Sequence, residues 1–150
     1  MINVVLVEPE IPQNTGNIAR TCAAIGARLH IIRPIPFEIS DRTARRAGLD
    51  YWQYVDIIFH KNLDTFLDIH KENLFFFSTK ARTIYTGITY PENPFLLFGK
   101  ETAGLPESLI FSDKGTAVTI PMLSHIRSLN LSNSVAVAAY EVLRQQGSEL

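Results

Sequence analysis

Apolar residues fall into short runs that are separated by polar or proline-containing stretches along the whole chain. The first run, Ile2–Val7, is continuously apolar, which is typical of a parallel strand buried on both faces. Pro9 and Pro12 follow it and end the pattern. Similar runs predict further strands at Leu29–Ile32, Val55–Phe59, Leu74–Ser78, Phe95–Phe98 and Ala117–Ile120.

Helical spacing appears between these runs. Gly16–Ile25 carries apolar residues at helical intervals, and Gly26 is its expected C-terminal stop. Asn14 or Thr15 is the expected N-cap. Because strands alternate with helices, we predict a single α/β domain over residues 1–150, with a mainly parallel sheet covered by helices on both faces. Shorter helices are predicted at Asp41–Ala47, Leu63–His70 and Pro106–Phe111.

The last helix is expected from Ser132 to Gln146, with a polar cap at Ser132 or Asn133. Small residues on this helix, among them Ala136 and Ala139, allow another helix to approach closely. The helix has one apolar face, formed at intervals of three and four residues by Val135, Ala138, Ala139, Val142 and Leu143.

Composition narrows the class of protein. The 150 residues are 46% hydrophobic and 19% charged, which excludes a disordered chain. The longest apolar runs span only a few residues, so we expect no membrane-spanning segment. The single cysteine and the lack of a leader-like start favour a reducing, cytoplasmic setting. The net charge of −1 neither indicates nor excludes nucleic-acid binding, since a few arginines on one face suffice for phosphate contacts.

Several common site motifs are missing from the sequence. It has no G-x-G-x-x-G dinucleotide fingerprint, no phosphate-binding P-loop and no G-x-S-x-G nucleophile elbow. Its histidines lack the spacing of metal ligands, so we expect no bound metal. These histidines are His30, His60, His70 and His125.

Three unusual segments remain, and each follows a predicted strand. The segment NTGNIAR at 14–20 places polar side chains and free N–H groups at a helix start. The segment LLFGKETAGLP at 96–106 combines a carboxylate with two glycines, which let a ligand approach the backbone closely. The stretch 120–134 is a loop expected to present its backbone amides. Taken singly, each segment also fits an ordinary helix cap, a turn or a solvated charge.

Together, NTGNIAR, LLFGKETAGLP and IPM…RSLNLSNS…AAYE resemble the three motifs of the SPOUT class of RNA methyltransferases. The similarity extends over essentially the whole chain and is greatest to the minimal group that methylates the ribose 2′-hydroxyl at the tRNA wobble position. It implies a C-terminal trefoil knot, an exception to the rule against knots, that holds a bent S-adenosylmethionine. It also implies a homodimer in which the small-residue faces of the first and last helices pack against their copies, with Ala139 among the expected contacts, unless these alanines pack within the chain against its own sheet. The sites of this dimer are completed across the interface, and its surface binds the anticodon stem-loop of tRNA.

The resemblance also implies site residues. Arg20 and Asn14 form the expected catalytic pair. Arg20 stabilises developing negative charge or holds a phosphate, because a guanidinium stays protonated and is a poor general base. Asn14 orients Arg20 or the ribose. Expected cofactor contacts are Phe77, Thr79, Gly99, Ile120, Ser128 and Leu129. Candidate RNA-binding or positioning residues are Arg42, Arg45, Arg46, Glu101, Arg127, Asn130 and Tyr140, with Lys80 and Arg82 as further phosphate contacts.

Two alternatives stay open on the sequence. A related ribose methyltransferase acting on another RNA, such as ribosomal RNA, has much the same motifs. A noncatalytic module that binds S-adenosylmethionine or RNA is the other alternative, although the presence of both Asn14 and Arg20 speaks against it. A methyl-transfer assay on bulk tRNA and a map of modified nucleosides distinguish these hypotheses.

Overall fold

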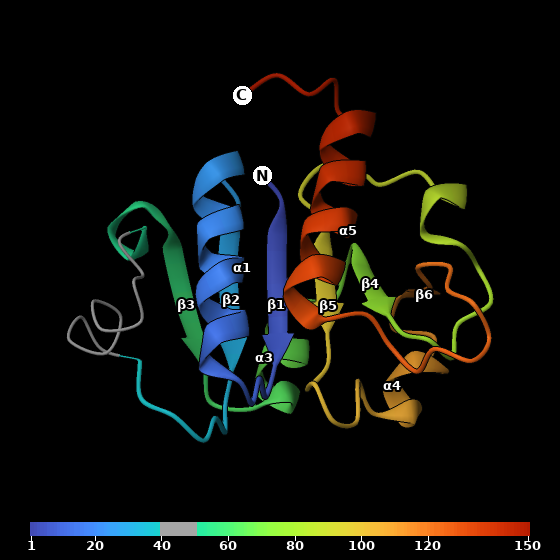
Figure 1. The fold of residues 1–150 in the computed structure, drawn as a ribbon, viewed down its shortest axis with the longest axis horizontal. Helices are drawn as coiled ribbons and strands as arrows, with labels where there is room; N and C mark the ends of the chain where they lie inside the picture. Colours follow the sequence, from blue (N-terminus) through green and yellow to red (C-terminus); the bar gives the residue numbers. More distant parts are fainter. Residues whose placement is uncertain (40–50) are drawn as a thin grey trace.

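Six parallel strands form one sheet in the computed structural model, which describes residues 1–39 and 51–150. The strands lie in the order β3-β2-β1-β5-β4-β6, and every pairing between neighbours is parallel (Figure 1). All of them occupy the apolar runs that predicted them. Their bounds are β1 Asn3–Val7, β2 Arg28–Ile32, β3 Asp56–His60, β4 Leu74–Phe77, β5 Phe95–Phe98 and β6 Thr116–Val118.

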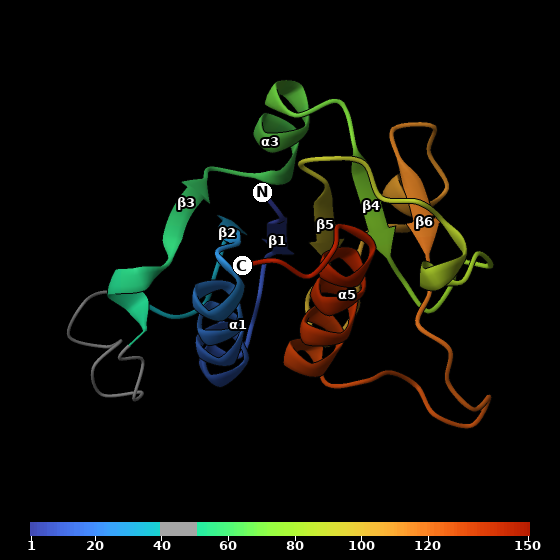
Figure 2. The same cartoon turned by 90° about the horizontal axis from the view of Figure 1, so that it is seen from above.

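Helices cover both faces of this sheet, as predicted. α1 and α5 lie side by side on one face, and α3 lies on the other (Figure 2), where α4 joins it in a second apolar cluster. The helix predicted at Asp41–Ala47 lies outside the described residues. The bounds are α1 Pro12–Ile25, α3 Leu63–Ile69, α4 Glu107–Ile110 and α5 Leu131–Gln145, with short 3₁₀ turns η1 at Trp52–Tyr54 and η2 at Tyr85–Gly87.

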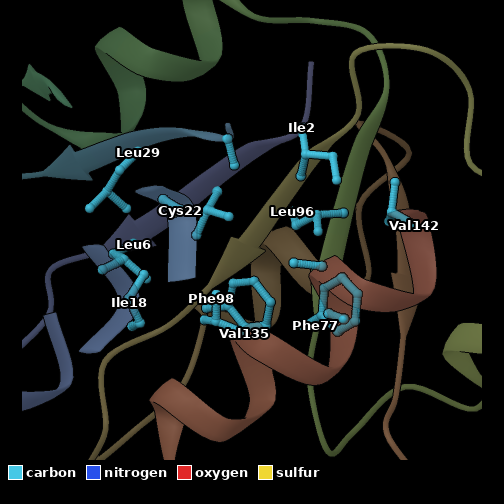
Figure 3. Packing of buried hydrophobic residues seen from close by; sticks show 14 of the residues in the cluster. Ile2, Leu6, Ile18, Cys22, Leu29, Phe77, Leu96, Phe98, Val135 and Val142 are labelled. Atoms are coloured by element: carbon cyan, nitrogen blue, oxygen red, sulfur yellow. The ribbon is translucent and has the colours of Figure 1, made fainter. Parts of the chain in front are cut away.

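Two apolar clusters fill the spaces between the sheet and its helices. Successive side chains of a strand point to opposite faces. Val4 and Leu6 of β1 therefore pack towards α1 and α5, while Val5 and Val7 pack towards α3 and α4. Figure 3 shows the first cluster, in which Cys22 of α1 lies among the strand residues. Because both faces are buried, the sheet is a fixed platform for whatever lies at its strand ends.

The start of α1 differs from the prediction. The helix begins at Pro12, since proline has the helical φ and lacks only an N–H that the first turn leaves unpaired. Ile11 takes the cap position and makes no side-chain cap hydrogen bond. Asn14 and Thr15, which were predicted as caps, lie inside the helix and are buried. Gly26 ends the helix as predicted, in the left-handed conformation with φ of 69°.

The start of α5 also differs from the prediction. Asn130 is the cap, because its side-chain oxygen accepts the backbone N–H groups of Ser132 and Asn133. The apolar face is buried as expected. Ala139 has 0% of its surface exposed and packs within the chain, where α5 lies beside α1. Its small size is therefore explained by the chain's own core and does not indicate a second copy.

The C-terminal segment returns from β6 at the edge of the sheet through residues 119–130 to α5 (Figures 1 and 2). This path does not by itself test the predicted trefoil knot, which stays a prediction. Within the described ranges 1–39 and 51–150, no helix is both long and apolar enough to cross a membrane.

Candidate functional site

A cavity of about 810 Å³ lies at the carboxyl-terminal edge of β4, β5 and β6. Parallel α/β sheets commonly bind ligands at this edge, because the loops that leave neighbouring strands converge there. The volume falls within the range of about 300–1,000 Å³ that is usual for small-molecule and cofactor sites. The cavity is walled by Asn14 of α1 and by residues in the stretches 77–80, 98–105, 119–122 and 127–131.

Most of the residues singled out from the sequence meet at this cavity. Arg20 and Tyr140 are not among the residues that line it. Arg42, Arg45 and Arg46 lie outside the described residues. The lining includes every expected cofactor contact, namely Phe77, Thr79, Gly99, Ile120, Ser128 and Leu129, and also Asn14, Glu101, Arg127 and Asn130.

The loop after β5 is shaped by a close backbone approach at Gly99. A Cβ placed on Gly99 would lie 1.9 Å from the carbonyl carbon of Gly104 and 2.1 Å from the backbone nitrogen of Leu105, so no side chain fits there. Gly104 is left-handed, with φ of 69°, and its N–H donates to the carbonyl of Lys100 at 2.8 Å. The two glycines therefore close the loop on itself, which is a different reason for them from the ligand approach that the sequence suggested.

Glu101 and Glu10 fasten this loop to the start of α1. The two carboxylate oxygens of Glu101 accept the backbone N–H groups of Glu10 at 2.9 Å and Ile11 at 2.7 Å. In return, Glu10 Oε1 accepts the N–H and the hydroxyl of Thr102, at 2.9 and 2.7 Å. These bonds from Thr102 hold the pKa of the Glu10 carboxyl below its usual range. The contacts of Glu101 are therefore internal and position the loop. Glu10 had no sequence signal beyond its place between two prolines.

A chain of side-chain hydrogen bonds joins the three motif segments. Asn130 Nδ2 donates to Asn14 Oδ1 at 3.1 Å, and Asn14 Nδ2 donates to Glu101 Oε2 at 3.4 Å. Asn14 is only 6% exposed, and its amide is held by protein partners on both sides. The geometry therefore favours Asn14 as the residue that holds the three loops in register, and its expected role in orienting Arg20 or the ribose stays a prediction.

Among the described residues, the stretch 123–129 between β6 and α5 makes fewer hydrogen bonds than the loop after β5. Every residue from Leu123 to Asn130 is exposed. Ile126 donates its backbone N–H to the carbonyl of Leu123 at 3.0 Å. Within the part of the chain that the structure describes, the N–H groups from Arg127 to Leu129 make no backbone–backbone hydrogen bond. These groups lie at the cavity wall, where a bound ligand offers them partners.

Arg20 lies on α1 but outside the lining of its own chain's cavity. It follows Asn14 by six residues, which at about 100° per residue places the two side chains on different sides of the helix. Its guanidinium carbon is 4.8 Å from the centre of the Tyr51 ring, a cation–π distance. Within one chain, the structure therefore does not give Arg20 the place beside the pocket that we expected. Tyr140 of α5 is 51% exposed and likewise lies outside the lining.

The fold also assembles a group of side chains that looked scattered in the sequence. His30 on β2, His60 at the end of β3 and His70 just after α3 bring one ring nitrogen each within 4.8 Å of one another. None of the three lines the cavity. Their sequence spacing follows no motif, so only the pairing of β2 with β3 and the position of α3 could reveal the group.

The chain is similar to proteins of one family. The model of the SpoU rRNA Methylase family matches residues 1–140. A tRNA (cytidine(34)-2′-O)-methyltransferase of Saccharophagus degradans is 46% identical over 149 residues, which cover 98% of this chain and 97% of that protein. A solved structure described as giving insights into the 2-OH methylation of C/U34 on tRNA has a TM-score of 0.91 and 43% identity, with 99% of this chain and 98% of that chain covered. An AdoMet-bound rRNA methyltransferase from Sinorhizobium meliloti has a TM-score of 0.83 and 26% identity, with 95% of this chain and 56% of that chain covered.

Proposed function

The chain belongs to the SpoU methylase family, and from that premise we propose that it methylates the ribose 2′-hydroxyl of the wobble nucleotide of tRNA, a cytidine or uridine at position 34. The methyl donor is S-adenosylmethionine, and the product is S-adenosylhomocysteine. One observation carries the proposal: the three loops that meet at the cavity belong to a chain that is 46% identical, over nearly its whole length, to a tRNA (cytidine(34)-2′-O)-methyltransferase.

The cavity lining fits S-adenosylmethionine. Phe77, Ile120 and Leu129 supply apolar surface for the adenosyl group. The N–H groups of 127–129, which make no backbone–backbone hydrogen bond among residues 1–39 and 51–150, supply donors for its polar atoms. When bound, the cofactor supplies a methyl group that its sulfonium already activates. The AdoMet-bound relative from Sinorhizobium meliloti supports this choice of donor.

The protein's own residues have the harder task of preparing the acceptor. A ribose hydroxyl is a poor nucleophile until its proton is drawn away, and a cation beside it stabilises the negative charge that develops. Arg20 has the permanent charge and the planar fork for this role, or for holding an adjacent phosphate. Because Arg20 lies outside the cavity of its own chain, this role requires that a second copy of the protein present it.

We therefore include a homodimer in the proposed function. Exposed apolar side chains in the middle of α5 and in the preceding loop support an interface there: Leu123 is 71% exposed, Ile126 47% and Val137 39%. The proposal requires that a two-fold contact at this face bring the α1 of one copy towards the loop of the other. Val137→Glu tests the interface without disturbing Ala139, which the chain's own core already encloses.

Binding of the RNA rests on few charges. Arg127 lines the cavity and is exposed, which suits a phosphate contact, whereas Lys80 forms an ion pair with Glu107. Arg42, Arg45 and Arg46 remain candidate contacts on sequence grounds. A net charge of −1 favours a small footprint such as the anticodon stem-loop, whose unpaired nucleotides expose their riboses. We extend the proposal to the place of the reaction: with tRNA as its substrate, the enzyme acts in the cytoplasm.

The decisive experiment incubates the protein with bulk tRNA and isotope-labelled S-adenosylmethionine, then identifies the labelled nucleosides by mass spectrometry. Labelled 2′-O-methylcytidine or 2′-O-methyluridine in fragments containing position 34 is the expected result. Label that appears only in ribosomal RNA, supplied in parallel, favours the rRNA enzyme. Cofactor binding without transfer to either RNA favours the noncatalytic module.

Arg20 is tested in the same assay. Arg20→Ala is expected to lower turnover by roughly 100-fold or more at saturating RNA, the range for loss of one charge-stabilising donor, while cofactor affinity is retained. Arg20→Lys is expected to rescue poorly, because an ammonium does not reproduce the guanidinium fork. Arg33→Ala is the matched control, since Arg33 is another exposed arginine that stacks on an aromatic ring, with its guanidinium carbon 4.7 Å from the centre of the Phe59 ring. Turnover close to wild type in Arg20→Ala excludes Arg20 from the reaction.

A further inference from the structure

The three histidines beneath α3 form a buried group that the proposed reaction does not use. His30 is 2% exposed, His60 is 8% exposed, and His70 is half-buried at the C-cap of α3. His30 Nδ1 lies 2.9 Å from His60 Nε2. The rings of Phe66 and Phe95 pack around the group, so its surroundings are apolar. A polar group of this kind, enclosed by apolar rings, needs a partner for each lone pair and each N–H.

Asn3 fixes the tautomer of His30. Asn3 Nδ2 donates to the carbonyls of Met1 at 3.3 Å and Pro94 at 3.4 Å, so its Oδ1 is the atom that faces His30 Nε2, at 3.1 Å. An oxygen only accepts, so His30 must carry its proton on Nε2. The Nδ1 of a neutral His30 is then a bare lone pair that points at the other two histidines. A metal-bound histidine usually donates its other ring N–H to an outer acceptor such as a carboxylate or a backbone carbonyl, and Asn3 Oδ1 stands in that position here.

We propose that His30, His60 and His70 bind one divalent transition-metal ion, with Zn²⁺ as the best match, and that this site ties β2, β3 and α3 together. Imidazole nitrogen suits zinc, and three protein ligands with one open position form a common zinc arrangement. Among the described residues, no carboxylate or thiol belongs to the group, so water or an external ligand is the fourth partner. The half-buried side of His70 is the way in from solvent.

The geometry needs only small side-chain movements to reach coordination. Zn–N bonds of about 2.0–2.1 Å in a tetrahedron require ligand nitrogens about 3.4 Å apart. The nitrogens of the group now lie within 4.8 Å of one another, and the His30–His60 pair is at hydrogen-bond distance. His60, which now donates from Nε2, exchanges that proton to its Nδ1 through solvent and frees the Nε2 lone pair. The exchange releases no net proton.

The protonation state of the group supports binding. Burial lowers the pKa of His30 to about 3, with a smaller contribution from His60. Burial also lowers the pKa values of His60 and His70. These shifts favour the neutral imidazole, which is the form whose lone pair a metal ion binds.

The test uses untagged full-length protein that has been treated with a chelator and then titrated with Zn²⁺ in a calorimeter. We expect one Zn²⁺ per chain with a Kd at or below about 1 μM, and a rise in Tm that grows with Zn²⁺ concentration. His70→Gln is expected to weaken binding at least about 100-fold, beyond the 10- to 100-fold loss that removal of an outer partner causes. His125→Gln is the matched control, because His125 is exposed in the loop before α5, outside the group, and its loss leaves the affinity unchanged.

A second measurement needs no variant. Co²⁺ added to the wild-type protein is expected to give the intense visible absorption of a four-coordinate site, and Zn²⁺ is expected to shift the ¹⁵N resonances of His30 Nδ1 and one nitrogen each of His60 and His70. Absence of Zn²⁺ binding in the wild type, binding of equal strength in His70→Gln, or ¹⁵N shifts confined to other residues would each overturn the proposal. None of these readouts depends on methyl transfer, so they stand or fall separately from the proposed function.

Discussion

Two walls of the cavity, the loop after β5 and the loop after β6, are built in opposite ways. Residues 99–105 close on themselves through Gly99 and Gly104 and are fastened to α1 by the reciprocal bonds of Glu10 and Glu101. Residues 123–130 are exposed throughout, and they make a single backbone–backbone hydrogen bond among themselves within the described chain. Both walls line the same cavity.

The difference separates what the chain builds before binding from what a ligand must complete. The first wall is already held in place by bonds within the protein, from Gly104 to Lys100 and between Glu101, Glu10 and Thr102. The second leaves N–H groups without backbone partners and apolar side chains in solvent, so ordering it costs conformational entropy that ligand contacts must offset. We infer that the first wall sets the shape of the site. The affinity for a ligand then depends on the hydrogen bonds and apolar contacts that the ligand makes with the second wall.

The largest effect is expected from breaking the closed wall at Gly99. In Gly99→Ala, the new Cβ would lie 1.9 Å from a backbone carbon, so the loop must open. We expect a loss of about 3 kcal/mol in unfolding free energy, at the upper end of overpacking costs, together with loss of cofactor binding. Urea unfolding and calorimetry measure the two effects. Gly87→Ala is the control, because a Cβ there meets nothing within 4 Å. Equal stability of the two variants would contradict the account of this wall.

A smaller loss is expected when the fastening to α1 is weakened. Glu101→Gln replaces one of the two accepting oxygens by an NH₂ group, which then faces the N–H of Glu10 or Ile11. A charge-assisted pair of bonds is lost in part, so we expect about 2 kcal/mol of destabilisation and slower turnover with little change in the affinity for tRNA. Glu92→Gln, at an exposed position, is the control for the loss of a surface carboxylate. Unchanged urea unfolding in Glu101→Gln would show that the bonds of Glu101 to the start of α1 do not contribute to stability.

The contrast between the walls also shows how far the sequence alone could go. The strands and the helix stop at Gly26 followed from local pattern, because apolar periodicity and a left-handed glycine act over a few residues. The three motif segments also stood out locally, and the six cofactor contacts that the family resemblance implied do line one cavity. The caps were misplaced among several suitable neighbouring residues, although their causes are local: Pro12 suits the first turn of α1, and Asn130 accepts N–H groups two and three residues further on. The bonds that link these helix starts to distant segments, from Ile11 to Glu101 and from Asn130 to Asn14, could not be predicted from local pattern.

What escaped prediction depends on register between distant elements. The position of Arg20 outside the cavity follows from the helix turning between residues 14 and 20 once Pro12 sets where α1 begins. The meeting of His30 with His60 follows from the pairing of β2 with β3. Ala139 looked like a contact for another copy, yet it packs in the chain's own core. None of these features can be predicted from the spacing of residues that are close in sequence.

A still smaller effect is expected at Asn130, where the two walls are joined. Asn130→Asp keeps the oxygen that caps α5 and loses the N–H that Asn14 accepts, while Asn130→Ala loses both. We expect Asn130→Ala to lose about 1 kcal/mol of stability, the usual value of a cap, and Asn130→Asp to lose less. Both variants are expected to bind S-adenosylmethionine up to about tenfold more weakly, the value of one hydrogen bond. Thermal unfolding and calorimetry separate the two outcomes, and unchanged affinity in both would show that the walls act independently.

The smallest expected effect is the pH dependence of the closed wall. The bonds from Thr102 hold the pKa of Glu10 below its ordinary value of 4.5, so the folded protein binds a proton there less readily than the unfolded chain does. Whatever stability Glu10 contributes is therefore fully present above about pH 4.5 and is lost as the pH falls through the depressed value. Glu10→Gln removes this term, so the difference between the unfolding midpoints of wild type and variant in urea is expected to be constant from pH 7 to 5 and to shrink towards pH 3. The loop after β6 has no carboxylate between residues 121 and 130, and its hydrogen exchange is expected to show no matching change. A difference that stays constant down to pH 3 would mean that the Glu10 carboxylate is not held by Thr102 in solution.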